Sequence, residues 1–275
     1  YKKIENGIPL LIPANKDIFI FKKKDIFKIK KKKLSSIIYN HNDLHYVGYK
    51  TSFGVNNKFL SKFLIKKKYI KFINFIDKGK KIAAFQTRNI PHFGHEEIIK
   101  MMLKKCNHVV INPVVGPKKK NDIKIEKLSE IFNKIIKKKF DNKISFIPIY
   151  TNMYYAGPRE AVHHSKIREK LGFSYFSVGR DHAGAENKYN PISAIQNLRK
   201  LKKKFKIKII THEGSYFCVK CKKAVIKNKC NHNKKHLLDI SGSNFRKSIL
   251  SGEKFKYADR KMQKYLIHKR SEIFN

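Results

Sequence analysis

Between residues 81 and 210 short apolar runs alternate with longer polar and amphipathic stretches, and this alternation constrains the fold of the 275-residue chain most strongly. The runs predict β-strands, and the stretches between them predict helices. This spacing favours an α/β protein with a parallel sheet and right-handed crossovers, in which ligands bind at the carboxyl ends of the strands. The expected strands, each with its following helix, are 81–85 (helix near 95–105), 108–115 (122–138), 144–149 (158–171), 175–179 (190–204) and 206–210.

The N-terminal part has a different character. Residues 8–40 contain the short β-like runs IPLLI, DIFIF, DIFKI and LSSIIY, broken by Pro, Asn and Lys. These runs predict a small, mostly β unit, which we separate from the α/β domain at residues 77 and 78. Because the chain starts at Tyr1 and not at Met, we expect the unit 1–77 to be N-terminally incomplete.

The formal charge of +44, from 64 Lys and Arg against 20 Asp and Glu, ordinarily suggests a polyanionic partner. Here the lysines are spread along the whole chain, and Ile, Asn, Phe and Tyr are also abundant, a pattern typical of A/T-rich coding. The aromatic and glycine signatures of RNA-binding modules are missing, so we expect no dedicated nucleic-acid function. No apolar run approaches the roughly 18 residues of a membrane span, which predicts a soluble, cytoplasmic protein without a membrane partner.

The stretch FQTRNIPHFGHEE, residues 85–97, carries the first candidate site. The segment 86–89 is expected to leave the first strand of the sheet, where buried Gln, Arg and Asn side chains are costly unless a polar ligand lies opposite. His92 and His95 are about one turn apart at a predicted helix start, where backbone N–H groups favour anions, and Gly94 is expected to let a ligand approach the backbone. Two such histidines alone also fit surface residues or metal ligands; with the segment 86–89 in front of them, they favour a polyphosphate site.

A second candidate, GRDHAG at residues 179–184, follows another predicted strand. Arg180 can bind phosphate or sulfate with two parallel hydrogen bonds, and the glycines allow backbone N–H groups to reach an oxyanion. Alone, the motif also fits a turn with an Arg–Asp pair. Further on, the segment 241–243 (SGS) is expected to cap a helix, and Arg246 projects from its first turn.

The spacing of Cys218, Cys221 and Cys230, with His232 and His236 just beyond, is typical of a metal site. A chain without a secretion signal is not expected to use these cysteines as disulfides. We therefore predict a structural Zn²⁺ ion held by three thiolates and one imidazole, with His232 slightly favoured over His236. The remaining cysteine, Cys106, is expected to be a buried structural thiol.

The segments QTRNIPHFGH, AGPREAVHHSKIREKLGFSYFSVGRDHAG and SGSNFR, in this order, resemble the ATP sulfurylase (sulfate adenylyltransferase) family, as does INPVVGPKKKNDI. The resemblance runs from about residue 80 to residue 270. It implies a Rossmann-like nucleotidyltransferase fold of the His-x-Gly-His type in residues 78–275, preceded by a truncated PUA-like β unit in residues 1–77. The Cys/His excursion at 214–236 would then position the SGSNFR segment over the active site.

The resemblance also implies the activity: ATP and sulfate give adenosine 5′-phosphosulfate and pyrophosphate, with Mg²⁺ on the triphosphate, in a homo-oligomer. It assigns sulfate to Gln86, Arg88 and the main chain of Ala183, catalysis to Thr87, Arg88, Asn89, His92 and His95, and the nucleotide to Gln86, Thr87, Arg88, Asn89, Gly179, Arg180, Asp181 and His182. The chain departs from the family pattern at Ile90, which separates Asn89 from Pro91, and at Ser243, where the family has Thr.

Three alternatives remain at this point. Another nucleotidyltransferase of the same fold would join AMP or CMP to a phosphorylated small molecule, but it would lack the QTRN and GRDHAG segments. A non-catalytic RNA-binding protein would use the β unit, the zinc site and the positive charge. A degraded, inactive enzyme is the third alternative. The physiological direction, sulfate assimilation or sulfite oxidation, stays open.

Overall fold

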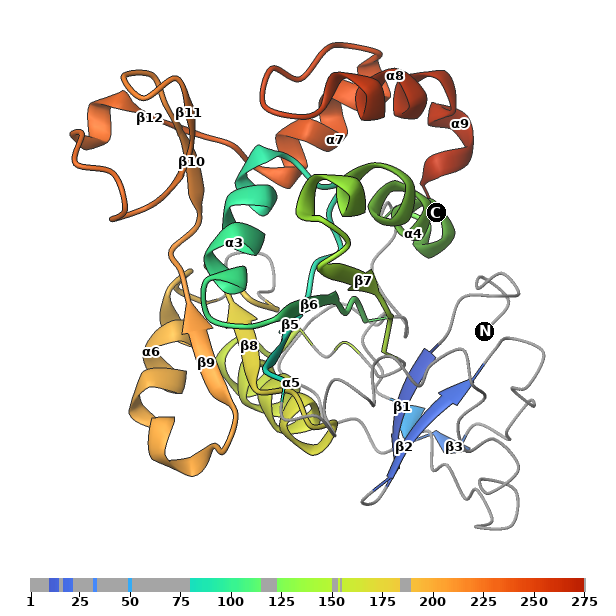
Figure 1. The fold of residues 1–275 in the computed structure, drawn as a ribbon, viewed down its shortest axis with the longest axis vertical. Helices are drawn as coiled ribbons and strands as arrows, with labels where there is room; N and C mark the ends of the chain where they lie inside the picture. Colours follow the sequence, from blue (N-terminus) through green and yellow to red (C-terminus); the bar gives the residue numbers. More distant parts are fainter. Residues whose placement is uncertain are drawn as a thin grey trace.

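The computed structural model describes residues 80–114, 123–149, 153, 155–183 and 189–274, together with the backbone of four short strands nearer the N-terminus (Figure 1). Strand β1 (Leu10–Ala14) pairs antiparallel with β2 (Asp17–Phe21), and β3 (Lys32–Lys33) pairs antiparallel with β4 (Tyr49–Lys50). The expected run DIFIF is β2, and the last three residues of IPLLI fall on β1, whereas the first two residues of IPLLI and the runs DIFKI and LSSIIY lie outside the described residues.

Five parallel strands form the central sheet, as the alternation in the sequence predicts. They are β5 (Ile82–Phe85), β6 (His108–Ile111), β7 (Ile144–Phe146), β8 (Tyr175–Val178) and β9 (Lys208–Thr211), in the order β7-β6-β5-β8-β9. The first strand of this sheet along the chain, β5, is its central strand. From there the chain runs outward through β6 to β7 and then crosses to β8 on the other side of β5. The strand order therefore reverses between β5 and β8, where the connections that leave the two adjacent strands run to helices on opposite faces of the sheet.

Helices cover both faces of this sheet (Figure 1). On one face lie α3 (Phe93–Leu103) and α4 (Ile125–Ile131), the latter continued by the π-helical segment η4 (Phe132–Ile136) and the 3-10 segment η5 (Lys137–Phe140). On the other face lie α5 (Pro158–Lys170) and α6 (Ser193–Lys200), the latter followed by the 3-10 turn η6 (Lys202–Lys204). Strands β5 and β6 are buried at every position, which explains their continuous apolar sequences.

Two boundaries differ from the sequence prediction for identifiable reasons. Helix α3 begins two residues earlier than expected because the side chain of His92 accepts a hydrogen bond from the Gly94 N–H and caps the helix. Strand β7 ends at Phe146, and beyond it only an isolated bridge joins Ile149 to Val114. Pro113 has no N–H to donate to the Ile147 carbonyl, which accepts from Asn112 Nδ2 at 2.7 Å instead. The regular ladder therefore stops, although the Ile147 and Ile149 N–H groups still donate to Ile111 O and Pro113 O.

Beyond β9 the chain forms a second, antiparallel sheet in the order β11-β10-β12, where the sequence predicts only an excursion. Its strands are β10 (Ser215–Cys218), β11 (Lys223–Ile226) and β12 (Leu237–Asp239), with the 3-10 turn η7 (Lys234–His236) before β12. This sheet packs against α3 and leads into α7 (Gly242–Ser251), α8 (Arg260–His268) and α9 (Arg270–Ile273) (Figure 1). Within the described ranges, no helix has the length and apolar character needed to cross a membrane.

Candidate active site

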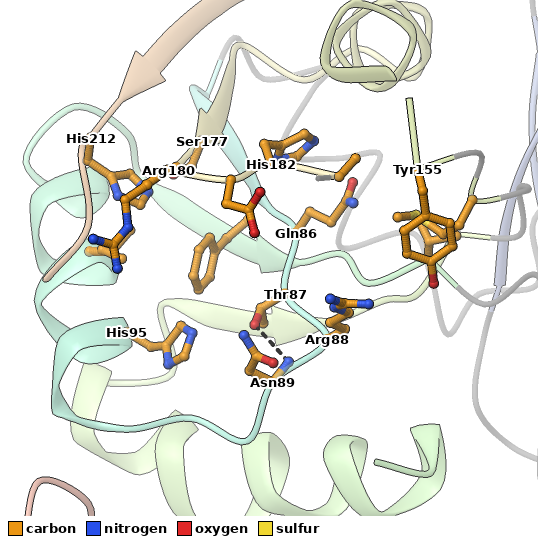
Figure 2. A pocket seen from close by; sticks show the side chains of 17 residues that line it. Gln86, Thr87, Arg88, Asn89, His95, Tyr155, Ser177, Arg180, His182 and His212 are labelled. Carbon is orange, nitrogen blue, oxygen red and sulfur yellow. Dashed lines mark hydrogen bonds between the residues drawn. The ribbon is translucent and has the colours of Figure 1, made fainter. Parts of the chain in front are cut away.

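The strand ends of the parallel sheet surround one pocket of about 190 Å³ (Figure 2). It lies at the reversal between β5 and β8, the usual ligand position in open α/β sheets. Both predicted segments, 86–89 and 179–183, line it along their whole length, whereas Gly184 lies outside the described residues. The lining comprises Phe85, Gln86, Thr87, Arg88, Asn89, His95, Ile98, Val114, Met153, Tyr155, Ser177, Gly179, Arg180, Asp181, His182, Ala183 and His212.

The loop after β5 is shaped by contacts within itself and with the start of α7. The Asn89 N–H donates to Thr87 Oγ1 at 3.2 Å, which folds the loop back on itself. Gly242 packs so closely on Asn89 that an added Cβ would lie 2.6 Å from Asn89 Cγ, and Arg246 Nη2 donates to Asn89 Oδ1 at 3.5 Å. Ser241 caps α7 by accepting from the Asn244 N–H at 3.2 Å, as predicted. The SGSNFR segment therefore contacts the pocket through Asn89, which lines it.

His92 and His95 lie together, with ring centroids 4.0 Å apart, but they occupy different positions relative to the pocket. His95 lines it, whereas His92 is the N-cap of α3 and lies outside the lining. The Nδ1 atom of each ring accepts a backbone N–H, from Gly94 in the case of His92 and from His92 in the case of His95, at 3.1 and 3.2 Å. Each neutral ring therefore carries its proton on Nε2 and can donate it to an anion.

The expectation that Gly94 admits a ligand is wrong. An added Cβ at Gly94 would lie 2.0 Å from Ser215 Oγ and 2.9 Å from His92 Cε1. The space beside this glycine is therefore filled by β10, and the residue is small because α3 and the antiparallel sheet pack closely there.

The loop after β8 holds an unusual backbone. Asp181 and Ala183 have φ angles of 55° and 53°, in the left-handed region that costs a non-glycine residue free energy. The turn is pinned at both ends, because the Asp181 N–H donates to Pro191 O at 2.7 Å and the Gly157 N–H donates to Ala183 O at 3.0 Å. Backbone strain held in this way beside a pocket is typical of a ligand-binding loop.

Arg180 connects this loop to the antiparallel sheet. Its Nη2 lies 3.2 Å from Asp239 Oδ1 on β12, and its Nη1 donates to the Tyr216 hydroxyl on β10 at 3.1 Å. The guanidinium is therefore already oriented, and it faces the pocket from the side of the second sheet (Figure 2).

Sequence reasoning missed three polar lining residues: Tyr155, Ser177 and His212 (Figure 2). His212 follows β9 directly, and its ring occupies the space beside Gly179, where an added Cβ would lie 2.6 Å from His212 Cε1. Among the described residues, the buried atoms Ser177 Oγ, His212 Nδ1 and Gln86 Oε1 have no hydrogen-bond partner. Because an unpaired buried polar atom is costly, three of them around one pocket indicate a polar ligand. The positions of Ser177 and His212 near strand ends were the only signal in the sequence, and Tyr155, in the loop before α5, had none.

A family model named ATP-sulfurylase matches residues 74–258, a range that contains this pocket and every segment around it. The chain belongs to the ATP-sulfurylase family. Its curated relatives include proteins named sulfate adenylyltransferase from Hyperthermus butylicus, 38% identical over 176 residues, and from Pyrococcus abyssi, 37% identical over 182 residues. These alignments cover 64% and 66% of this chain but only 45% and 48% of the relatives, so the chain spans less than half of their length.

The fold of this ATP-sulfurylase family member also occurs in a solved structure described as a hexameric APS kinase from Thiobacillus denitrificans. The two superpose with a TM-score of 0.55 at 14% identity, over 75% of this chain and 42% of that one. At this identity the likeness establishes the shared fold alone.

The charge of the ATP-sulfurylase pocket comes from its arginines, because its histidines are neutral at physiological pH. Burial lowers the pKa of His182 to about 3 and that of His212 to about 4, and it holds the pKa of His95 well below its usual range. Burial likewise lowers the pKa of His92 to about 4. In the described part of the chain, Asp181 is the single carboxylate that lines the pocket, and Arg88 and Arg180 line it as well. The pocket therefore offers positive charge and neutral N–H donors, which suit a polyanion.

The antiparallel sheet of this family member carries the predicted Cys/His cluster. The four donor atoms, the sulfurs of Cys218, Cys221 and Cys230 and the Nδ1 of His232, all lie within 4.8 Å of one another. Sulfur–sulfur distances are 3.6 Å, and sulfur–nitrogen distances are 3.3 to 3.4 Å. His236 is not part of this group, and its ring lies edge-on to His232 at 6.4 Å. Cys106 is buried elsewhere, donates to His108 O at 3.3 Å, and has its pKa raised to about 11 by burial, as expected for a structural thiol.

Proposed function

We propose that the chain is the catalytic part of a sulfate adenylyltransferase, which transfers the adenylyl group of ATP to sulfate and forms adenosine 5′-phosphosulfate and pyrophosphate. The observation that carries the proposal is the convergence of segments 86–89 and 179–183 on one cationic pocket at the strand-order reversal. Membership of the ATP-sulfurylase family supports it. No observation favours an RNA-binding protein or another nucleotidyltransferase.

In this proposal sulfate is held by Gln86, by Arg88 and by the main chain of Ala183. Arg88 lies with its Cζ 5.8 Å from the Tyr155 ring centroid, a cation–π contact that restricts the guanidinium. The Ala183 carbonyl is engaged by Gly157, which fixes the orientation of the peptide. A guanidinium and an amide can together bind several oxygens of a tetrahedral dianion.

The nucleotide is held on the other side by Gly179, Arg180, Asp181 and His182, with Gln86, Thr87, Arg88 and Asn89 along the triphosphate. Sulfate already has free anionic oxygens, so the reaction needs no general base. A sulfate oxygen attacks the α-phosphorus in line, the bond from that phosphorus to the bridging oxygen breaks, and pyrophosphate leaves. The chief difficulty is bringing two anions together, and oriented positive groups with N–H donors overcome it.

His95, with His92 behind it, donates Nε2–H to the phosphate oxygens as charge builds up on them. Both rings are neutral because of their burial, so they act as oriented donors and not as acids. Thr87 and Asn89 complete the group of catalytic residues with Arg88. Thr87 holds the loop conformation, and Asn89 reaches the phosphates with its side chain fixed by Gly242 and Arg246.

Mg²⁺ is expected with ATP, held mostly by triphosphate oxygens, because Asp181 is the single carboxylate among the described residues that line the pocket. When bound, the ion neutralises charge on the leaving pyrophosphate.

We assign the Cys/His cluster to a structural Zn²⁺ ion with His232 as the fourth ligand. Zinc–ligand bonds of about 2.0 to 2.3 Å in a tetrahedron separate the donor atoms by roughly 3.6 to 3.8 Å. The observed separations of 3.3 to 3.6 Å are close to these values. The ion would hold β10 and β12 together and thereby fix Arg180 and the SGSNFR segment.

On the same family resemblance we further propose a PUA-like β domain for residues 1–77, a cytoplasmic location and a homo-oligomeric assembly. The division at residues 77 and 78 belongs to this proposal. The physiological direction of the reaction follows from the metabolism around the enzyme and not from the pocket.

The test is the formation of ATP from adenosine 5′-phosphosulfate and pyrophosphate with Mg²⁺, followed by luminescence. Arg88→Ala should lower kcat/KM about a thousandfold, because it removes a charge that the transition state requires. Arg199→Ala, which removes an exposed arginine on α6, is the control and should change kcat/KM less than twofold. Folded, zinc-loaded protein that makes no ATP would overturn the proposal.

A further inference from the structure

A buried polar chain lies directly behind the pocket and ends at His182. The sequence of α5, PREAVHHSKIREK, suggests a solvated surface helix, yet Glu160, His164 and Arg168 are 2%, 0% and 0% exposed. They are spaced four residues apart and therefore share one face of the helix, which is turned toward the sheet. Burying an acid, an imidazole and a guanidinium on one helix face costs free energy that burying apolar residues there would not cost. The arrangement therefore suggests a functional role for these side chains.

The contacts form a continuous line from the helix start to the pocket. His164 Nδ1 lies 3.1 Å from His182 Nε2, and His164 Nε2 lies 3.3 Å from Glu160 Oε1. The second carboxylate oxygen, Glu160 Oε2, accepts the Ala156 N–H at 2.9 Å. The contact between His164 Nε2 and Glu160 is a charge–dipole contact and not a well-aligned hydrogen bond, and within the described part of the chain Nε2 has no hydrogen-bond partner.

Arg168 fixes this chain to the sheet. Its Nε donates to Asn112 Oδ1 at 2.9 Å and its Nη2 to Asn112 O at 3.1 Å, directly after β6. Burial lowers the pKa of Arg168 to about 9, and attraction by Glu160 opposes this effect, so the guanidinium stays charged at neutral pH beside the carboxylate. The two opposite charges stabilise each other in the interior.

The positions of the protons follow from these contacts. Burial lowers the pKa of His182 to about 3 and holds that of His164 well below its usual range, so each neutral ring carries one proton. The carboxylate of Glu160 can only accept, so the proton of His164 belongs on Nε2 and its Nδ1 is an acceptor. His182 Nε2 must then be the donor in the contact between the rings, and His182 Nδ1 keeps a free lone pair.

We propose that Glu160 and His164 are positioning residues that hold His182 in the tautomer whose Nδ1 accepts a hydrogen bond. The other described groups that we assign to the substrates in this pocket are mostly donors and positive charges, which select phosphate and sulfate oxygens. An acceptor at His182 instead selects a hydroxyl or amino donor, and therefore the nucleoside part of the nucleotide. The identity of the ligand in this inference rests on the proposed function, whereas the tautomer of His182 rests on the contacts of His164 and Glu160.

The substitution Glu160→Gln tests the buried polar chain that ends at His182, because it replaces the carboxylate by an amide of almost the same shape. The Ala156 N–H would retain the amide oxygen, so the amide NH2 would face His164 Nε2 and force it to accept. The proton of His164 then moves to Nδ1, His182 Nε2 becomes the acceptor, and the His182 proton moves to Nδ1 inside the pocket. Imidazole ¹⁵N chemical shifts, with His182 assigned by substitution, should report this exchange of protonated and unprotonated nitrogens.

In the same variant the KM for ATP should rise about tenfold, since one hydrogen bond to the nucleoside is replaced by two donors facing each other. The kcat and the KM for sulfate should change less than threefold. Glu169→Gln is the matched control, because Glu169 lies on the same helix and bonds to Lys166 and to the Ile207 N–H and not to the buried chain. It should leave the His182 tautomer and the KM for ATP unchanged.

A second pair of variants covers the case in which Glu160→Gln does not fold. His164→Asn keeps an acceptor near the position of Nδ1 and should retain most of the nucleotide affinity, whereas His164→Leu should lose about tenfold. ATP affinity measured by calorimetry and the ¹⁵N shifts do not need turnover, so they separate this inference from the proposed activity. An unchanged His182 tautomer in Glu160→Gln, or equal affinities in His164→Asn and His164→Leu, would overturn the inference.

Discussion

The pocket and the Cys/His cluster are two groups of polar side chains built in opposite ways. The pocket takes its residues from segments far apart in the sequence, and the buried strands β5, β6 and β8 bring them together. The cluster takes its four donors from residues 218–232, where Cys218 ends β10 and the other three lie in the turns between strands of three or four residues, with Val219 and Leu238 exposed nearby. The hydrophobic core therefore fixes the geometry of the pocket, whereas the cluster depends on the ion that its donors hold.

The two regions nevertheless meet. Asp239 and Tyr216 of the antiparallel sheet hold Arg180, and Gly242, just after β12, packs on Asn89. We therefore expect substitutions in the pocket to affect mainly activity. Removal of the metal or of its ligands in the Cys/His cluster should affect both local order and activity.

The largest expected effect separates activity from stability. His95→Ala should lower kcat about a thousandfold, because it removes a donor aimed at the transition state. The free energy of unfolding should fall by only about 1 to 2 kcal/mol, because the ring also accepts the His92 N–H at the start of α3. Parallel kinetics and unfolding curves measure both quantities. A variant that loses most of its stability together with its activity would contradict the view that the hydrophobic core fixes the geometry of the pocket.

Removal of the metal should have the next largest effect. Chelation, or Cys221→Ser, should release backbone amides of 215–239 to hydrogen exchange while β5, β6 and β8 stay protected. Activity should fall about a hundredfold because Arg180 and Asn89 lose their supports. Full activity in metal-free protein would break the link between the two regions.

These two regions also differ in how far the sequence predicts them. The strand and helix order, the two segments at strand ends and the Cys/His donors are all local patterns. The structure places both segments around one pocket and gathers the four donors in one cluster. Glu160, His164 and Arg168 were missed because their burial arises from packing of α5 on the sheet, which a charged sequence conceals. His212 was missed because a lone histidine after a strand has no pattern, and Gly94 was misassigned because its neighbour, Ser215, is far along the chain.

The pH dependence of stability gives a smaller effect. His212 has a pKa of about 4 in the folded protein and about 6.5 when unfolded, so the unfolded chain binds the proton more tightly. The resulting stability is present above pH 6.5 and is lost as the pH falls toward 4. His212→Gln should reduce the unfolding free energy lost on acidification by about 2 kcal/mol. This is less than the roughly 3 kcal/mol that corresponds to the whole pKa shift, because the side chain faces a pocket open to water. Urea unfolding of both proteins at pH 7 and pH 4.5 measures how much unfolding free energy each loses on acidification. Any loss of metal at pH 4.5 affects both proteins equally and drops out of the comparison. Equal losses of unfolding free energy in the two proteins between pH 7 and pH 4.5 would contradict this prediction.

The smallest effect is local. Ser241→Ala removes the N-cap of α7 and should cost about 1 kcal/mol of unfolding free energy. Ser251→Ala, at the other end of the same helix, is the control and should cost less than half as much. Because Gly242 follows the cap and packs on Asn89, which we assign to the triphosphate, the KM for ATP should rise in the first variant alone. Equal effects of the two substitutions would show that the cap does not position the pocket.

The central claim is direct, in-line transfer of the adenylyl group to sulfate within one pocket. Exchange of labelled pyrophosphate into ATP tests it most directly, because the label enters ATP only after the bond to the α-phosphorus has broken. The account predicts exchange when sulfate is present and none when sulfate is left out. Exchange without sulfate would reveal an adenylyl group held by the protein itself and would contradict the account, as would no exchange under any condition.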